Sequence, residues 1–312
     1  MRGNLCFYDG ALYGRIKKVT IRQKKERDML IALIIIFGIF CIICLISMFV
    51  DTNRFIIRKY VIESPKITEE KRVVLIADLH NKQFDEGNGK LLAAIDKINP
   101  DFILSAGDIL TAKPNNSTDL AIDFMGKLSA KYTVYNGMGN HEYRLKLYPD
   151  YYVGMYETYK AQMIKDNCPL LDNETMLNGE FAITGLNIDR SYYKRFKRVH
   201  MEDDYVEKEV GAPDKERFQI LIAHNPEYFD VYSKWGADLV VSGHVHGGMM
   251  RLPLLGGVIS PKCVPFPKYD GGMFEKNKTK LIISRGLGCH TIPVRVFNPG
   301  ELIEIHLKPC KS

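Results

Sequence analysis

The sequence of 312 residues has few of the features that mark small secreted or low-complexity proteins. It contains one tryptophan and seven cysteines, two of which, Cys41 and Cys44, lie inside a long apolar run. The spacing of the other cysteines selects no disulfide pair. Apolar residues make up 46% of the chain and charged residues 26%, and there is no internal repeat. These values are close to the globular average, so they exclude wholesale disorder, collagen and a disulfide-dense mini-protein.

The net charge of +6 is concentrated near the N-terminus. Residues 1–28 hold eight bases and three acids, whereas the other 284 residues hold 35 bases and 34 acids. Proteins that bind nucleic acids usually present a basic surface. The nearly neutral remainder therefore argues against nucleic acid as a partner.

An uncharged run of 22 residues, Met29–Val50, follows the basic arm. As a helix it would be roughly 33 Å long, which is enough for a hydrocarbon core of about 30 Å. A cleaved signal peptide fits less well, because its apolar segment is usually about 7–15 residues and ends before a small-x-small site. The run therefore predicts a transmembrane helix, which is the expected contact with a membrane.

The charges on either side of this run indicate an orientation. Seven bases lie between Arg15 and Arg27, and only three bases follow the run closely. The more basic flank normally stays in the cytoplasm. We therefore expect a single-pass protein with a cytoplasmic arm (1–28), a membrane helix (29–50), a linker (51–70) and an outward-facing domain (71–308).

The remainder of the chain alternates strand-like and helix-like segments, which is typical of an α/β domain. Short apolar runs that end in turn residues predict buried strands at 72–77, 101–106, 131–136, 218–223 and 237–241. Helical periodicity falls between them at 87–98, 118–128 and 152–165. The C-terminal part predicts strands at 280–283, 294–297 and 302–306, with little helix, and so suggests a second sheet.

The five earlier strands share a chemical feature. Each is followed by Asp, Asn or His, and five of the eight histidines of the chain lie at these positions. Residues at the carboxyl ends of sheet strands converge on one crevice. Ordinary turn residues would not gather the histidines in this way, so we expect a common site.

The residue types at these strand ends are metal ligands. Asp78 and His80 are two residues apart, as are His244 and His246, so each pair can point to one side of an extended segment. Mixed nitrogen and oxygen donors suit divalent Mn, Fe or Zn. The carboxylate of Asp108 could bridge two such ions about 3.5–4 Å apart, the spacing used in phosphoryl chemistry. The remaining candidates are Asn140, His141 and His224.

These blocks resemble the calcineurin-like metallophosphoesterases. The family pattern D-x-H, G-D, G-N-H-[DE], H and G-H-x-H occurs in order over about 170 residues, at 78–80, 107–108, 139–142, 224 and 243–246. Similarity to a membrane-anchored bacterial subgroup extends to 224–226, 242–248 and 284–288. The expected fold is a four-layer α/β sandwich of two mixed sheets flanked by helices.

The resemblance also implies roles for individual residues. Asp108 would bridge two divalent ions, His141 would give a proton or a hydrogen bond to the leaving-group oxygen, and a metal-bridging hydroxide would attack phosphorus. The subgroup is associated with phosphodiesters and pyrophosphates, including lipid-linked ones such as UDP-2,3-diacylglucosamine. The other ligands would be Asp78, His80 and His246 for the first ion and Asn140, His224 and His244 for the second.

The roles of two residues stay open, and one position differs from the family pattern. Glu142 is either a residue that orients a ligand histidine or a turn residue that faces solvent. Arg285 is either a phosphate-binding residue or a partner in a structural ion pair. Many relatives follow the bridging aspartate with a further Asp and Arg, whereas this chain has Ile109 and Leu110 after Asp108.

We therefore expect a membrane-anchored hydrolase that uses two metal ions to cleave a phosphodiester or pyrophosphate bond, lipid-linked substrates included. The alternatives are a phosphomonoesterase or nuclease that acts on a soluble substrate, and a non-catalytic scaffold. A scaffold is disfavoured because none of the ligand positions has been lost.

Overall fold

The computed structural model describes residues 6–114, 116–194, 199–252, 254–260, 264–289 and 293–310. Cys263 lies outside these residues. The chain divides into two units, Met1–Ser47 and Met48–Ser312, and each is described by itself.

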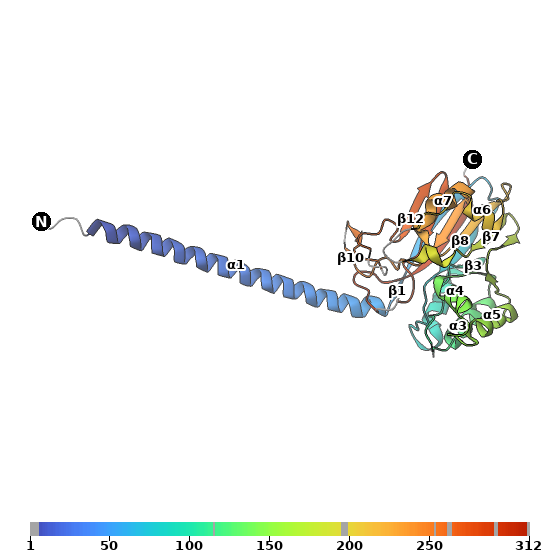
Figure 1. Cartoon of the computed structure of the whole chain (residues 1–312), viewed down its shortest axis with the longest axis horizontal. Helices are drawn as coiled ribbons and strands as arrows, with labels where there is room; N and C mark the ends of the chain where they lie inside the picture. The colour runs from blue at the N-terminus through green and yellow to red at the C-terminus, as the bar shows by residue number, and fades with distance from the viewer. Residues whose placement is uncertain are drawn as a thin grey trace. The chain divides into compact units, whose positions relative to one another are not determined.

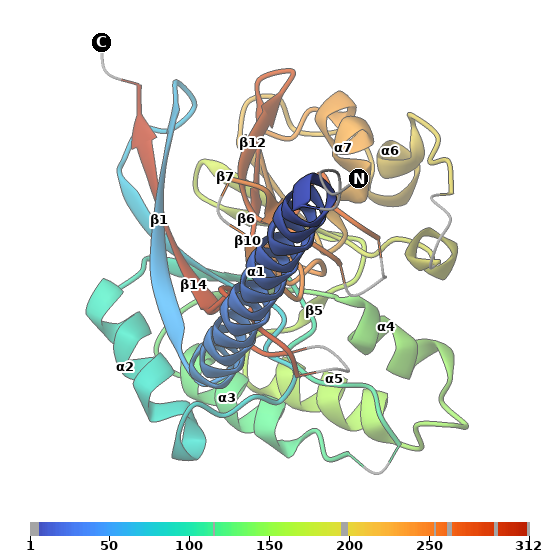
Figure 2. The ribbon, with the colours of Figure 1, turned by 90° about the vertical axis from the view of Figure 1, so that its left-hand side faces the viewer.

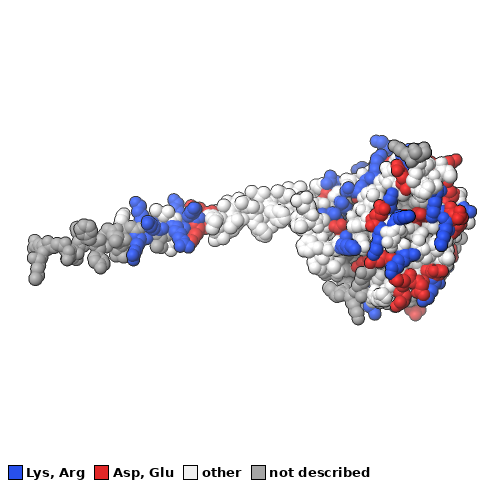
Figure 3. Space-filling view, turned by 90° about the horizontal axis from the view of Figure 1, so that it is seen from above, with Lys and Arg blue, Asp and Glu red and all other residues white. Residues whose placement is uncertain are grey.

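The N-terminal helix α1 (Cys6–Thr52) contains the expected apolar run and extends beyond both of its ends. Its section Thr20–Thr52 is long and apolar enough to cross a membrane. Bases cluster along the N-terminal part of the helix and are followed by a stretch without charged side chains (Figure 3).

The larger unit contains two six-stranded sheets, both of them mixed (Figure 1). The first sheet has the order β1-β14-β2-β3-β4-β5, in which β14 is antiparallel to β2 and the other pairs are parallel. Its strands are β1 (Phe55–Ser64), β14 (Gly300–Pro309), β2 (Lys71–Ile76), β3 (Phe102–Ser105), β4 (Val134–Gly137) and β5 (Leu170–Leu171).

The second sheet has the order β12-β13-β9-β8-β7-β6, with a parallel centre and an antiparallel strand at each edge. Its strands are β12 (Gly272–Lys276), β13 (Thr279–Ile283), β9 (Leu239–Ser242), β8 (Phe218–Ala223), β7 (Phe181–Leu186) and β6 (Glu174–Asn178). A small hairpin, β10 (Arg251–Leu252) and β11 (Gly256–Gly257), follows β9.

The central strands are continuous apolar runs because each is buried on both faces. In β2, Val73 and Leu75 pack between the two sheets, whereas Val74 and Ile76 pack against helices. In β8, Ile220 faces the other sheet and Leu221 faces helices. This alternation produces four layers, helix–sheet–sheet–helix, as the family resemblance implied.

The helices divide between the two outer layers (Figure 2). The first sheet is covered by α2 (Gly89–Ile98), α3 (Asp119–Ser129), α4 (Asn140–Leu147) and α5 (Met155–Lys165). The second is covered by α6 (Tyr205–Val210) and α7 (Phe229–Trp235). Short 3₁₀ turns are η1 (Glu86–Asn88), η2 (Arg190–Tyr193) and η3 (Pro226–Tyr228).

Two expectations about the chain need correction. The segment 51–70, expected to be a linker, contains β1, which pairs in parallel with β14 from Phe55 opposite Gly300 to Ser64 opposite Pro309. Its half-exposed edge position allows bases within the strand, so composition did not reveal it. The expected strand at 294–297 forms only an isolated bridge, between Val296 and Met250.

Candidate metal centre

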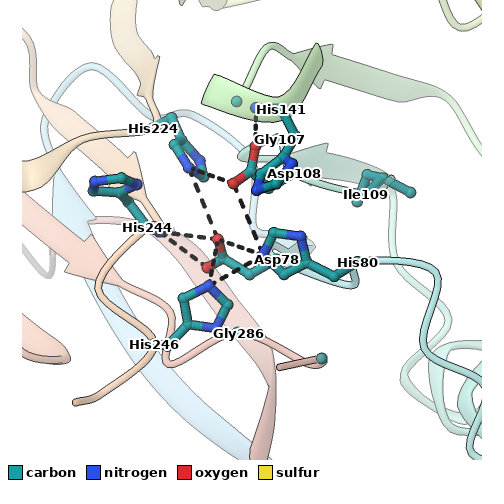
Figure 4. Close-up of polar contacts among 12 residues, drawn as sticks. Asp78, His80, Gly107, Asp108, Ile109, His141, His224, His244, His246 and Gly286 are labelled. Carbon is teal, nitrogen blue, oxygen red and sulfur yellow. Dashed lines mark hydrogen bonds and ion pairs between the residues drawn. The ribbon is translucent and has the colours of Figure 1, made fainter. Parts of the chain in front are cut away.

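The polar residues predicted to converge follow strands that end at one side of the two sheets. Asp78 and His80 follow β2, and Asp108 follows β3. His224 follows β8, and His244 and His246 follow β9. Asn140 and His141 begin α4, and two residues separate Asn140 from Gly137 at the end of β4. Figure 4 shows the aspartates and histidines directed toward one another.

The backbone around the site adopts left-handed conformations that are uncommon outside glycine. Asp78, His80, Asp108, His244 and His246 have φ between 50° and 72°. Such conformations cost of order 1–3 kcal/mol each and cluster at functional sites. All five are residues that sequence reasoning selected as ligands, although residues elsewhere, including Asn81 beside His80, also have positive φ.

Two glycines allow the carboxylates to sit against the neighbouring loops. A Cβ at Gly139 would overlap the Asp108 carboxylate, and a Cβ at Gly243 would overlap that of Asp78. Each glycine directly precedes a candidate ligand, Asn140 or His244. Because a side chain at either position would overlap a carboxylate, the loops can approach this closely only with glycine there.

One group of candidate ligands consists of Asp78, His80 and His246, whose ligand atoms lie within 4.8 Å of one another. The Nε2 atoms of His80 and His246 are 3.1 Å apart, and Nε2 of His246 is 3.5 Å from Oδ1 of Asp78. Ligand atoms held about 2.0–2.2 Å from a single ion lie about 3–3.5 Å apart. These three side chains are therefore spaced for one ion.

A second group consists of Asp108, His224 and His244, within the same 4.8 Å limit. Oδ2 of Asp108 lies 3.2 Å from Nε2 of His224 and 3.8 Å from Nε2 of His80. This carboxylate therefore reaches both groups, which is the arrangement a bridging ligand requires.

Contacts behind the cluster orient two of its members. Nδ1 of His224 is 2.7 Å from the carbonyl oxygen of Ala106, so its Nδ1–H can donate there while Nε2 faces the carboxylates. The Asp78 carboxylate accepts the backbone N–H of His244 at 3.0 Å. The carbonyl oxygen of Ala106 thereby fixes the tautomer of His224, as such partners do for ligating histidines.

The donor set fits divalent cations. Within the described part of the chain, Oδ1 of Asn140 is buried and accepts no hydrogen bond. A buried amide oxygen without a donor is costly unless a cation takes that role. Imidazole, carboxylate and amide donors together suit Mn, Fe or Zn.

The electrostatics of the cluster lead to the same conclusion. Burial, together with the Asp108 carboxylate, raises the pKa of Asp78 to about 7. Burial alone would lower the pKa of His224, but the Asp108 and Asp78 carboxylates outweigh it and raise that pKa to about 9. Two buried carboxylates this close need positive charge beside them. The His224 imidazolium can supply it, and a divalent cation held by the same groups would supply it in its place.

His141 lies beside the cluster, where hydrogen bonds fix its ring and its backbone. The backbone N–H of Ala112 donates to its Nδ1 at 2.8 Å, so a neutral ring carries its proton on Nε2. Burial lowers the pKa of His141, which favours that neutral form. The backbone N–H of His141 donates to Oδ1 of Asp108 at 2.7 Å. Its side chain also lies within 4.8 Å of the ligand atoms of His80 and Asp108, so proximity alone does not separate a ligand from a hydrogen-bond donor.

Glu142 is a buried anchor for the Asp108 loop and fits neither of the two roles considered from the sequence. Its carboxylate accepts the backbone N–H groups of Asp108 and Ile109 at 2.9 Å and that of Gly139 at 3.0 Å. Leu110 lies a little further away, with its N–H donating at 3.4 Å. One carboxylate thus joins two ligand loops, and backbone groups of Ile109 and Leu110 take part.

Arg285 lies next to the ligand loop but is engaged with a carboxylate. Its Nε is 3.9 Å from Oε1 of the fully buried Glu301, an ion-pair distance at which no hydrogen bond forms, and its backbone N–H donates to Oε2 of the same residue at 3.0 Å. Arg58 forms a second ion pair with Glu301. These contacts favour the structural interpretation, and contact with substrate phosphate stays a prediction.

Sequence reasoning missed two residues that support the site. The buried guanidinium of Arg295 donates to the carbonyl oxygens of Arg285, Gly286 and Gly288, and so fixes the loop that packs against Asp78. The buried Asn298 donates to the carbonyl oxygen of His246 at 2.8 Å. Neither residue belongs to a ligand motif, and each acts through contacts that only the fold creates.

Comparison with known proteins agrees with this geometry. The sequence profile described as calcineurin-like phosphoesterase matches residues 71–248. An uncharacterized metallophosphoesterase of Campylobacter jejuni is 27% identical over 256 residues, which cover 80% of this chain and 62% of that protein. The chain thus spans less than two thirds of the length of that relative.

Two further relatives carry more specific names. Phosphodiesterase YaeI of Escherichia coli is 24% identical over 221 residues, covering 70% of this chain and 75% of that protein. UDP-2,3-diacylglucosamine pyrophosphatase LpxG of Chlamydia muridarum is 23% identical over 279 residues, covering 74% of this chain and 82% of that protein.

Proposed function

The chain belongs to the calcineurin-like phosphoesterase family, and we propose that it hydrolyses a phosphodiester or pyrophosphate bond with the help of two divalent metal ions. The observation that carries this proposal is the position of Asp108, whose Oδ2 lies between His224 and His80. One carboxylate shared by two groups of ligands is suited to a pair of ions acting on a phosphoryl group.

The residues that would hold the ions follow from the two groups. We assign Asp78, His80 and His246 to the first ion, Asn140, His224 and His244 to the second, and Asp108 to both. Two bound divalent ions supply positive charge to the phosphoryl oxygens and make water acidic enough to act as a nucleophile near neutral pH.

His141 has its own part in the reaction. Because its Nδ1 already accepts the Ala112 N–H, the proton that it can offer is on Nε2. We infer that this N–H donates a hydrogen bond to the leaving-group oxygen as negative charge develops there. Hydrogen-bond donors aimed at a developing charge are a major source of rate enhancement.

A lipid-linked substrate is the more specific part of the proposal. It is supported by the section Thr20–Thr52, which can cross a membrane, and by the similarity to LpxG, named for its lipid substrate. A tether raises the local concentration of any substrate held in the same bilayer. A soluble phosphomonoester or nucleic acid substrate is the alternative, and a panel of both kinds of substrate would decide between them.

We further propose that the unit Met48–Ser312 faces outward. The support is the excess of bases before the apolar run, because the more basic flank of a membrane helix normally remains in the cytoplasm. Protease added to intact cells should then digest this unit and leave the N-terminal arm protected. Complete protection of the unit would reverse the orientation.

The hydrolase assignment predicts metal-dependent turnover by the purified full-length chain. With Mn²⁺ it should hydrolyse bis(p-nitrophenyl) phosphate, and a chelator should abolish turnover until metal is restored. An ion present at about 100 times its Kd should also stabilise the fold by about 2.7 kcal/mol, measurable as a rise in Tm. Absence of activity with each of Mn, Fe, Zn and Ni would contradict the assignment.

A further inference from the structure

Two neighbouring loops beside the candidate metal centre expose large apolar side chains. Leu254 and Leu255 lie in the turn between β10 and β11 and are 106% and 63% exposed. Phe266 is 60% exposed on the next segment, where its backbone N–H donates to the carbonyl oxygen of Val258 at 2.9 Å. Exposed apolar groups gathered in this way mark contact surfaces for proteins or membranes. We refer to Leu254, Leu255 and Phe266 as the apolar tips.

The loops that carry the apolar tips are built directly on the ligand loop. Nη1 of Arg251 donates to the carbonyl oxygen of Gly247 at 2.8 Å. The backbone N–H of Met249 donates to the carbonyl oxygen of Ile259 at 2.9 Å. Only a few residues therefore separate His246 from the exposed surface.

The same loops are joined to the last turn of α1. The backbone N–H of Arg251 donates to the carbonyl oxygen of Val296 at 2.9 Å. Two residues further on, the backbone N–H of Asn298 donates to Oδ2 of the buried Asp51 at 2.9 Å. Phe297, between them, is 37% exposed. Figure 1 shows β10 on the side of this unit where β1 begins.

This connection favours a bilayer over a protein as the partner that the apolar tips contact. Asp51 directly follows Val50, the last residue of the apolar run. If that run crosses a membrane, the membrane surface lies within about one helical turn of the Asp51–Asn298 contact, whatever direction the helix takes. The apolar tips belong to the loops fixed to that contact.

The charges nearby also suit a lipid surface. Arg54 is half-exposed although it pairs with Asp51 at 2.8 Å, and Nζ of Lys82 donates to the side chain of Asn53 at 2.9 Å. Lys268 is exposed two residues after Phe266. Bases that flank apolar side chains are attracted to anionic headgroups.

We propose that Leu254, Leu255 and Phe266 insert into the interfacial layer of the bilayer that holds α1. The ligand loop then rests at the membrane surface, where a phosphate ester can reach the ligands while its acyl chains remain in the lipid. This inference rests on the proposed membrane anchoring, and it specifies how an anchored enzyme would receive a lipid-linked substrate.

Tryptophan substitution tests the contact. The full chain with Leu255→Trp or Phe266→Trp would be reconstituted in vesicles of phosphatidylcholine and phosphatidylglycerol, with and without brominated acyl chains. Brominated acyl chains should quench the added fluorescence, relative to vesicles without bromine, if the side chain lies in the interface. The control Val153→Trp places the reporter at an 82% exposed position between α4 and α5 and should not be quenched. The natural Trp235, largely buried on α7, supplies the background.

The possible outcomes separate the inference from the function on which it rests. Extraction with alkaline carbonate shows whether α1 is embedded. Embedded protein whose tip reporters are not quenched overturns the inference and leaves the anchoring intact. Protein that carbonate removes overturns the anchoring itself. Tip fluorescence that responds to protein concentration and not to brominated lipid assigns the tips to contact with a second copy, and also overturns the inference.

Discussion

Asp108→Asn should remove metal from the protein and reduce hydrolysis by about 10³-fold or more, since the charge stabilisation that metal ions supply is worth several kcal/mol. The substitution keeps the shape of the side chain but removes the charge that faces both His224 and His80. An amide can also turn an NH₂ group toward these histidines. Elemental analysis of the purified variant, together with kcat/KM, would measure both losses.

A matched substitution separates this effect from a general loss of charge. Asp123 lies on the exposed face of α3 and pairs with Lys127 at 2.6 Å. Asp123→Asn should keep both the metal content and the activity, since exposed pairs of this kind contribute little. If Asp108→Asn retained the full metal content and normal turnover, Asp108 would not be the bridging ligand.

His141→Ala should keep the metal ions and lower kcat by about 10²–10⁴-fold, the usual contribution of a positioned proton or hydrogen-bond donor. The loss should be larger for an alkyl ester than for a p-nitrophenyl ester, because p-nitrophenolate leaves without help. A residue that only supports the fold would not produce this dependence on the leaving group. Metal content and kcat for both esters are the measurements.

The control for this variant is His200→Ala, at an exposed position before α6. This variant should change neither the metal content nor kcat. Loss of metal from His141→Ala would show that His141 is itself a ligand, in line with its closeness to His80 and Asp108. The hydrogen-bonding role proposed for it would then be wrong.

The candidate ligand set could be proposed from the sequence because each motif block is local. A buried strand and the polar residue that ends it are neighbours in the chain, as in β2 with Asp78 or β8 with His224. Parallel strands bring their carboxyl ends to one edge, so the order of the blocks was enough to predict convergence. The short apolar runs also predicted buried strands, and the strands of both sheets contribute to the core.

The residues that hold the site in place could not be read in the same way. Glu142 caps its own helix by accepting the N–H of Gly139, but it also accepts the N–H of Asp108 from a distant loop, and that backbone donor leaves no trace in the sequence. Arg295 and Asn298 are buried polar residues whose partners are carbonyl oxygens. Their roles appear only when the loops are folded against one another.

The sequence by itself determined an apolar run long enough to cross a membrane, an α/β fold class and a set of candidate metal ligands. Tertiary structure decided that β1 extends the first sheet beside β14, some 245 residues away, and that Asp51 contacts Asn298 next to the ligand loop. The difference has one physical cause. Periodicity and motif spacing depend on neighbours in the chain, whereas strand pairing and buried hydrogen bonds depend on groups that meet only after folding.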